Sequence, residues 1–181
     1  MRVVTGTARG RKLKPVPGEA TRPTTASVKE AVFSIIQFEI EGRRVLDLFA
    51  GTGQLGIEAL SRGAAQAVFV DNNSAALAVV RDNLAVTGLE EKAAVVASDA
   101  LSYVTARPEP FDIILLDPPY RSSLLTDVMA RLSTVDILRP GGIIVCETAA
   151  DLAPPAPPAS CVLSRTYRYG TQAVCLYRRD A

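Results

Sequence analysis

The chain has 181 residues, 48% of them hydrophobic and 22% charged, with a net charge of +1, which fits one globular domain with a sizeable core. It has no apolar run near the roughly 20 residues of a membrane span, and its charged N-terminus has no following apolar stretch, so we expect no secretory signal and a cytoplasmic protein without a membrane partner. The absence of histidine excludes an imidazole general base and His-ligated metal sites. We therefore expect no metal, and catalysis would depend on carboxylates, backbone carbonyls, aromatic faces or a cofactor.

The N-terminal segment is basic. Residues 1–30 carry seven lysines and arginines against two glutamates, a charge of +5 that leaves −4 for the rest of the chain. This pattern is typical of a face that meets phosphate, although a solvated segment that keeps the protein soluble has the same composition. Residues 2–5 and 11–16 predict a small basic hairpin. We expect residues 1–22 to form a substrate arm on a main domain of residues 23–181.

A glycine-rich turn follows the first strand of the main domain. A helix is predicted from Thr24 and Thr25 to about Phe38, and then a buried strand at residues 45–49. The strand leads into Asp47-Leu-Phe-Ala-Gly51-Thr-Gly53-Gln-Leu-Gly56 and a helix over residues 54–62. Glycines at such a strand-to-helix turn allow the backbone to approach a ligand closely, although a purely structural turn has the same composition.

Acidic residues follow the first three strands. Asp71 ends a strand at residues 67–70, twenty positions after Gly51, where a carboxylate can accept both hydroxyls of a ribose. The spacing also matches a dinucleotide-binding motif. Asp47 favours S-adenosylmethionine, because an acid there repels a pyrophosphate but suits the charged amino end of a methionine. Asp99, after a strand at residues 93–96, is suited to the adenine amino group or to capping a helix.

The most apolar strand, residues 111–116, ends in Asp117-Pro118-Pro119-Tyr120. Ligands of open parallel sheets bind at this edge. The Asp117 carboxylate and the Pro118 carbonyl can accept both N–H groups of a planar amine, which orients its nitrogen and stabilises its developing positive charge. Tyr120 offers a face for stacking a base. A Pro-Pro turn with incidental neighbours is the alternative.

The C-terminal third completes the alternating pattern. A helix is predicted over residues 123–138 and a strand over 143–146, followed by a proline-rich loop at 153–159. Residues 161–167 and 171–177 predict an antiparallel hairpin. Its Tyr167, Arg168 and Tyr169 are secondary candidates for substrate contact, with packing and turn roles as the alternative. The cysteines Cys146, Cys161 and Cys175 form no CxxC pair; two lie in apolar strands, which predicts buried, reduced thiols.

Strands that alternate with helices and are nearly continuously apolar predict an α/β fold. Its mostly parallel sheet would be covered on both faces in a Rossmann-like arrangement, with an antiparallel hairpin at the C-terminal end.

The motifs carry a family resemblance. Asp117 to Tyr120 after a glycine loop is similar to methyltransferases that modify exocyclic base amines. The longer string LDLFAGTGQLGIEALSRGA, residues 46–64, resembles the RsmD family of guanine-N2 methyltransferases of 16S ribosomal RNA. So do Gly10-Arg11-Lys12-Leu13, Thr21-Arg22-Pro23-Thr24, and Val28-Lys29-Glu30 with Phe33. This resemblance covers nearly the whole chain and implies a class I methyltransferase fold with a seven-stranded sheet.

The resemblance also implies an activity and its residues. The cofactor is S-adenosylmethionine and the substrate is 16S ribosomal RNA, which we expect within a 30S subunit or an assembly intermediate, with the protein as a monomer. Asp117, Pro118, Pro119 and Tyr120 fall on the catalytic motif. The expected RNA contacts of the basic arm are Arg9, Arg11, Lys12 and Arg22. The expected cofactor positions are Asp47, Phe49, Gly51, Gly53, Asp71, Asn72, Asp99 and Ala100.

Three alternatives share parts of this pattern. A DNA adenine-N6 methyltransferase has the same catalytic motif, but this chain has little room for a separate target-recognition region. A nicotinamide-dependent oxidoreductase uses a similar glycine loop, but leaves Asp47 and Asp117 to Tyr120 unexplained. A non-catalytic RNA-binding or ribosome-assembly module would bind RNA without needing a methyl-donor pocket.

Overall fold

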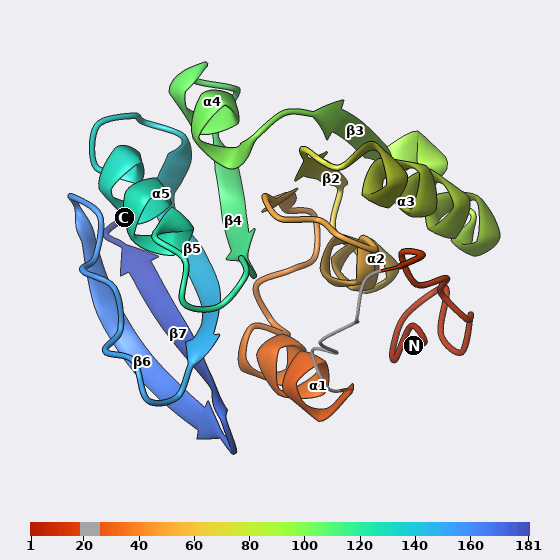
Figure 1. Cartoon of the computed structure of the whole chain (residues 1–181), viewed down its shortest axis with the longest axis horizontal. Helices are drawn as coiled ribbons and strands as arrows, with labels where there is room; N and C mark the ends of the chain where they lie inside the picture. The colour runs from red at the N-terminus through yellow and green to blue at the C-terminus, as the bar shows by residue number, and fades with distance from the viewer. Residues whose placement is uncertain (19–25) are drawn as a thin grey trace.

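The structure, a computed structural model, describes residues 1–18 and 26–181 and contains a seven-stranded sheet with the strand order β3-β2-β1-β4-β5-β7-β6 (Figure 1). Strands β1 to β5 are parallel to one another, while β7 is antiparallel to both β5 and β6. This arrangement confirms the predicted fold class. The strands are β1 (Arg44–Asp47), β2 (Gln66–Asp71), β3 (Ala93–Ala97), β4 (Phe111–Leu116), β5 (Leu138–Ala149), β6 (Cys161–Tyr169) and β7 (Gln172–Arg179).

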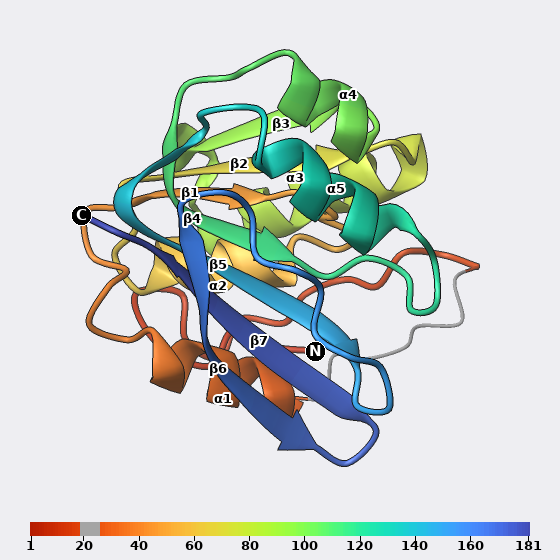
Figure 2. The same ribbon diagram turned by 90° about the vertical axis from the view of Figure 1, so that its left-hand side faces the viewer.

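Helices cover both faces of the sheet, as Figure 2 shows from the side. One hydrophobic cluster joins one face to α1, α2 and α3, through residues such as Phe33, Leu60 and Leu84. A second cluster joins the other face to α4 and α5, through Val104 and Met129. Every residue of β4 is buried because the strand is covered on both sides. The helices are α1 (Ala26–Ile35), α2 (Gln54–Ser61), α3 (Ser74–Thr87), α4 (Ala100–Thr105) and α5 (Leu124–Leu132), with a short 3₁₀ helix, η1 (Glu90–Lys92).

The strand order places a ligand-binding crevice beside β1. The chain runs outward from β1 to β2 and β3, and then returns to pair β4 with the other side of β1. At such a reversal the connections leave on opposite faces and open a crevice at the carboxyl ends of the strands. The glycine turn after β1 and Asp117 after β4 both lie at this edge.

The predicted helix over residues 123–138 is too long, because α5 ends at Leu132. The Ser133 and Thr134 hydroxyls donate to backbone carbonyls of the last turn, which competes with further helix. The chain then enters the sheet, because Leu138 pairs with Phe111 in an irregular start to β5.

The other predicted elements differ less from the structure. The expected N-terminal hairpin is a loop with one antiparallel bridge, between Arg2 and Lys12. The predicted start of the first helix lies outside the described residues, and that helix ends at Ile35 instead of about Phe38. Cys146 and Cys175 are buried cross-strand partners, which confirms the prediction of buried thiols. In the described part of the chain, no helix has the length and apolarity to cross a membrane.

Candidate active site

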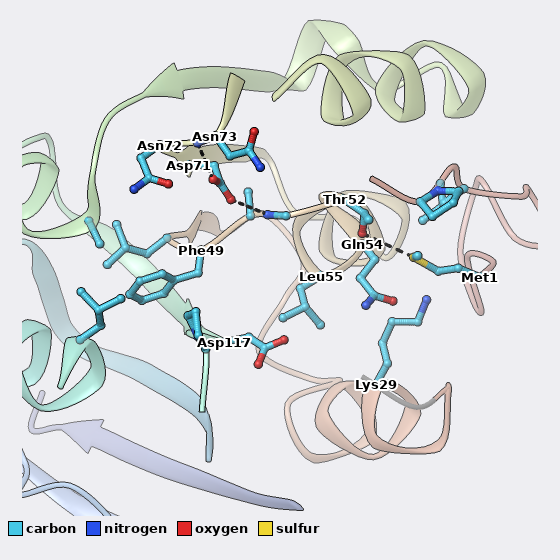
Figure 3. Close-up of a pocket in the computed structure, with 18 of the residues that line it drawn as sticks. Met1, Lys29, Phe49, Thr52, Gln54, Leu55, Asp71, Asn72, Asn73 and Asp117 are labelled. Atoms are coloured by element: carbon cyan, nitrogen blue, oxygen red, sulfur yellow. Dashed lines mark hydrogen bonds between the residues drawn. The ribbon is translucent and has the colours of Figure 1, made fainter. Parts of the chain in front are cut away.

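A cleft of about 910 Å³ opens at the carboxyl ends of β1, β2 and β4 (Figure 3). Its wall comes from the N-terminal loop, α1, the glycine turn, the ends of β2 and β3, and the segment after β4. The lining residues are Met1, Arg2, Leu13, Pro15, Ala26, Lys29, Leu48, Phe49, Ala50, Gly51, Thr52, Gln54, Leu55, Asp71, Asn72, Asn73, Ser98, Asp99, Ala100, Asp117, Pro119 and Leu124.

The glycine turn is shaped by local backbone requirements. Gly51 has a φ of 54° and Gly53 a φ of 79°, in the left-handed region that favours glycine. Gly56 lies in α2, where an added Cβ would be 2.3 Å from the ring of Phe69 on β2. This glycine therefore allows the helix to pack closely on the sheet. Gly51 lines the cleft. Gly53 does not line it, and its left-handed backbone conformation sets the shape of the turn.

Asp71 is held in the cleft by the backbone. Its Oδ2 accepts from the N–H of Gly51 at 2.9 Å, and its Oδ1 accepts from the N–H of Asn73 at 2.9 Å. Each carboxylate oxygen has further acceptor capacity. Asp71 and its neighbour Asn72 lie across the cleft from Asp117 and Lys29 (Figure 3). A fixed carboxylate at the end of the second strand is suited to accept two hydroxyls.

Asp47 lies behind the glycine turn instead of lining the cleft. Its side chain is 1% exposed, and its Oδ2 accepts from the N–H of Gly56 at 3.0 Å. Its Oδ1 has no hydrogen-bond partner among residues 1–18 and 26–181. Burial, with a smaller contribution from the charges of Asp117 and Asp71, raises the pKa of Asp47 to about 8. A cation in the cleft would relieve this repulsion, whereas a pyrophosphate would add to it.

The end of the cleft beside α4 combines a carboxylate with an apolar surface. Asp99 caps α4, its side chain accepting from the N–H of Ser102, and hydrogen bonds from the hydroxyl and then the N–H of Ser102 lower the pKa of Asp99. It also lines the cleft beside Ala100. Phe49 is partly buried against the cluster under α4 and α5. Helix capping and ligand binding are compatible at Asp99, because a carboxylate has more acceptor sites than the cap uses and Asp99 also lines the cleft.

The residues of the Asp-Pro-Pro-Tyr motif divide between two cavities. Asp117 and Pro119 line the large cleft, and the charge of Asp117 reaches Asp47. Pro118 and Tyr120 instead line an adjoining pocket of about 80 Å³, together with Pro119. The Tyr120 hydroxyl accepts from Nε2 of Gln172 on β7 at 2.8 Å. The sequence predicted one cleft and did not indicate this division.

Lys29 is a lining residue that the sequence analysis connected with no role. It is 2% exposed, and its Nζ donates to the carbonyl of Arg2 at 2.6 Å and lies 3.5 Å from Oε2 of Glu58. Burial lowers its pKa, although Glu58 opposes the shift. Only the string Val28-Lys29-Glu30 drew attention to it. Its contacts depend on three segments that are distant in sequence.

The N-terminal loop is anchored to the main body of the protein. The N–H groups of Val4 and Thr5 donate to the carboxylate of Glu58 in α2, at 2.9 and 3.0 Å. The Lys14 N–H donates to Oδ1 of Asn83 in α3, whose Nδ2 donates to the carbonyl of Thr52 in the glycine turn. The loop is thus fastened to the turn that shapes the cleft. Arg9, Arg11 and Lys12 are exposed, and Arg22 lies outside the described residues.

Comparison with known proteins gives full-length matches. A family model described as "Conserved hypothetical protein 95" matches residues 1–178. The Bacillus subtilis protein YlbH, provisionally named an rRNA methyltransferase, is 40% identical over 182 aligned residues, covering 99% of each chain. Ribosomal RNA small subunit methyltransferase D of Escherichia coli is 37% identical over 182 aligned residues, covering 100% of this chain and 91% of its own. A solved structure of Escherichia coli yhhF, provisionally named a methyltransferase, has a TM-score of 0.90 and 36% identity, covering 100% of this chain and 98% of its own.

Proposed function

Because the chain belongs to the RsmD family, whose model is described as "Conserved hypothetical protein 95", we propose that it is an S-adenosylmethionine-dependent methyltransferase of small-subunit ribosomal RNA. We further propose that the acceptor is the exocyclic N2 amine of a guanine in 16S ribosomal RNA. The observation that carries the proposal is that Asp71 and Asp117 line one cleft, with Asp47 buried behind its glycine turn. That arrangement suits a cationic nucleoside and the amine it methylates.

The cleft fits the donor at three points. Asp71, fixed by two backbone N–H groups, accepts the ribose hydroxyls. Phe49 and Ala100 provide apolar surface for the adenine, and Asp99 accepts from its amino group. Asp117, whose charge reaches Asp47, makes the opposite region negative, and a sulfonium and an ammonium group bound there would favour the ionised form of Asp47.

Three further residues complete the donor site in this proposal. Lys29 pairs with the donor's carboxylate, while Gly51 lets the backbone approach the ligand and Asn72 contacts it beside Asp71. Gly53 keeps the shape of the turn. When bound, the donor supplies a methyl group on positively charged sulfur, which is a good leaving group for transfer to a nucleophile.

The acceptor amine is held by the Asp-Pro-Pro-Tyr motif. The Asp117 carboxylate and the Pro118 carbonyl accept its two N–H groups, which directs the nitrogen toward the cleft and stabilises the positive charge that develops on it. Pro119 restricts the backbone at this turn. Tyr120 stacks on the base after it is turned out of the RNA. Since the chain has no histidine, Asp117 or water takes the proton.

The remaining elements serve RNA binding. We propose that residues 1–22 form a substrate arm on the domain of residues 23–181, with Arg9, Arg11, Lys12 and Arg22 contacting phosphates. Such contacts provide affinity but no choice of sequence. The substrate is the RNA within a 30S subunit or an assembly intermediate, and the protein acts as a monomer.

The proposal can be tested with a panel of donors and acceptors. Calorimetry should detect binding of S-adenosylmethionine and no binding of nicotinamide dinucleotides; the reverse result would favour an oxidoreductase. Labelled S-adenosylmethionine should then transfer its methyl group to unmodified 30S particles or 16S ribosomal RNA, and not to duplex DNA. Transfer to DNA alone would replace the proposed acceptor, and RNA binding without donor binding would indicate a non-catalytic module.

A further inference from the structure

One face of β6 carries a row of aromatic and basic side chains. Arg165, Tyr167 and Tyr169 alternate along the strand, so they lie on the same face. Tyr167 is paired with Val174, and both belong to the cluster under α1 and α2, which places the row on the α1 side of the sheet. The guanidinium of Arg165 lies 6.0 Å from the centroid of the Tyr167 ring. The three side chains therefore form one continuous surface, which we call the β6 row.

The β6 row is open to solvent although its rings are supported. β6 is the last strand of the sheet order. Arg165 is exposed, whereas Tyr167 and Tyr169 are partly buried against the core. Partial burial raises the pKa of Tyr169, so its phenol stays neutral at physiological pH. Rings held on one side and exposed on the other lose little freedom when a planar group stacks on them.

The row begins at the proposed acceptor site. Tyr169 is the cross-strand partner of Gln172, and Gln172 donates to the hydroxyl of Tyr120 at 2.8 Å. Gln172 also pairs with Ala149 at the carboxyl end of β5, so the turn between β6 and β7 lies at the active-site edge of the sheet (Figure 2). From there the row runs along β6 away from the motif, first Tyr169, then Tyr167, then Arg165.

We propose that the β6 row binds the single-stranded nucleotides next to the methylated base. The inference rests on the proposed function, since it takes the acceptor to be RNA. Aromatic rings stack on bases of any sequence, and an interleaved arginine adds stacking and attraction to phosphate. Alternate residues of a strand are about 6.6 Å apart, and bases in a stacked strand about 3.4 Å, so the row is matched to unstacked nucleotides.

Matched variants separate stacking from folding. Tyr169→Leu and Tyr167→Leu remove the ring but keep apolar volume, whereas Tyr169→Phe keeps the ring. Arg165→Ala is matched by Arg81→Ala, an exposed arginine on α3 at the far end of the sheet. For each variant, fluorescence anisotropy gives the dissociation constant for a single-stranded 16S fragment spanning the target. Calorimetry gives the dissociation constant for S-adenosylmethionine, and thermal unfolding gives the stability.

We expect Tyr169→Leu to weaken binding of the RNA fragment about tenfold, with donor affinity and unfolding temperature preserved. Tyr167→Leu and Arg165→Ala should weaken it about threefold to fivefold, and Tyr169→Phe and Arg81→Ala less than twofold. RNA affinity unchanged in Tyr169→Leu would overturn the inference. A loss seen with 30S particles but not with the naked fragment would overturn it in favour of a protein contact.

The two proposals can fail separately. If the wild-type protein transfers methyl groups to ribosomal RNA but RNA affinity is unchanged in the β6-row variants, only the inference about the β6 row is wrong. If it transfers none to RNA, the proposed function is wrong, and the binding measurements still decide whether the row contacts RNA.

Discussion

The two sides of the cleft are built in different ways. The proposed donor side comes mainly from one stretch of chain, β1 to β2 with the intervening turn, where backbone N–H groups hold Asp47 and Asp71. Lys29 from α1, and Asp99 and Ala100 after β3, complete it. The proposed acceptor side comprises Asp117 to Tyr120, Gln172 and the β6 row, which the sheet order brings together. Most of the donor side is local in sequence, whereas the acceptor side is assembled from distant segments.

This difference separates two properties of the enzyme. A site held by local backbone contacts is suited to a donor that is the same in every turnover. In a site assembled across several strands, substitutions in the β6–β7 hairpin can alter substrate binding without altering the glycine turn. Variants on the two sides should therefore affect the two ligands independently.

The largest effect is expected at Asp117, where the two sides meet. Asp117→Asn should lower the rate of methyl transfer at saturation by about 100- to 1000-fold, because it removes a charged acceptor aimed at the reacting amine. Donor affinity should change by less than about fivefold. Single-turnover kinetics and calorimetry measure the two quantities, with Asp127→Asn, at an exposed position of α5, as the control. Equal losses of donor binding and rate would place Asp117 on the donor side alone.

A smaller effect, confined to the donor, is expected at Asp71. Asp71→Asn should weaken donor binding about tenfold to 100-fold, since charged hydrogen bonds of about 1.5–3 kcal/mol are lost. RNA affinity should stay within twofold. Parallel calorimetry and anisotropy test this prediction, and loss of RNA binding in a folded variant would show that the two sides are not independent.

Asp47 should make the protein sensitive to pH. Its pKa is about 8 when folded and near 4 when unfolded, so the folded state binds the proton more tightly. Stability from this group is present below about pH 4 and is lost as the pH rises toward 8, at about 1 kcal/mol per pH unit. Denaturant unfolding from pH 5 to 7 should show this slope, and Asp47→Asn should remove it.

Binding of the donor should also change the protonation of Asp47. A cationic donor lowers the pKa of Asp47, so binding near pH 7 should release a proton. Calorimetry in buffers of different ionisation enthalpy detects the release. Release of the same size in Asp47→Asn would assign the proton to another group.

The smallest effect is expected at the N-terminal loop. Arg11→Ala with Lys12→Ala should weaken RNA binding about threefold to tenfold and reduce its dependence on salt, because each contact to phosphate releases counterions. Donor affinity should be unchanged, since neither residue lines the cleft. Equal losses of RNA and donor binding would count against a substrate arm.

The sequence predicted the donor side better than the acceptor side for a physical reason. The glycine turn and the strand β4 are specified by near neighbours in sequence, so composition and spacing reveal them. On the acceptor side, the positions of Gln172 and Tyr120 depend on a contact across 52 residues. Lys29, the donor-side residue without a predicted role, depends in the same way on a contact across 27 residues. The overlong helix at residues 123–138 was a further error of this kind, because pairing with Phe111 draws Leu138 into the sheet.

The most direct test of the account identifies the product. Unmodified 16S ribosomal RNA or 30S particles are incubated with labelled S-adenosylmethionine and either wild-type protein or Asp117→Asn, and the RNA is digested to nucleosides. The account predicts label in N2-methylguanosine with the wild-type protein and its loss in the variant. Label in another nucleoside, or equal labelling by the variant, would contradict it.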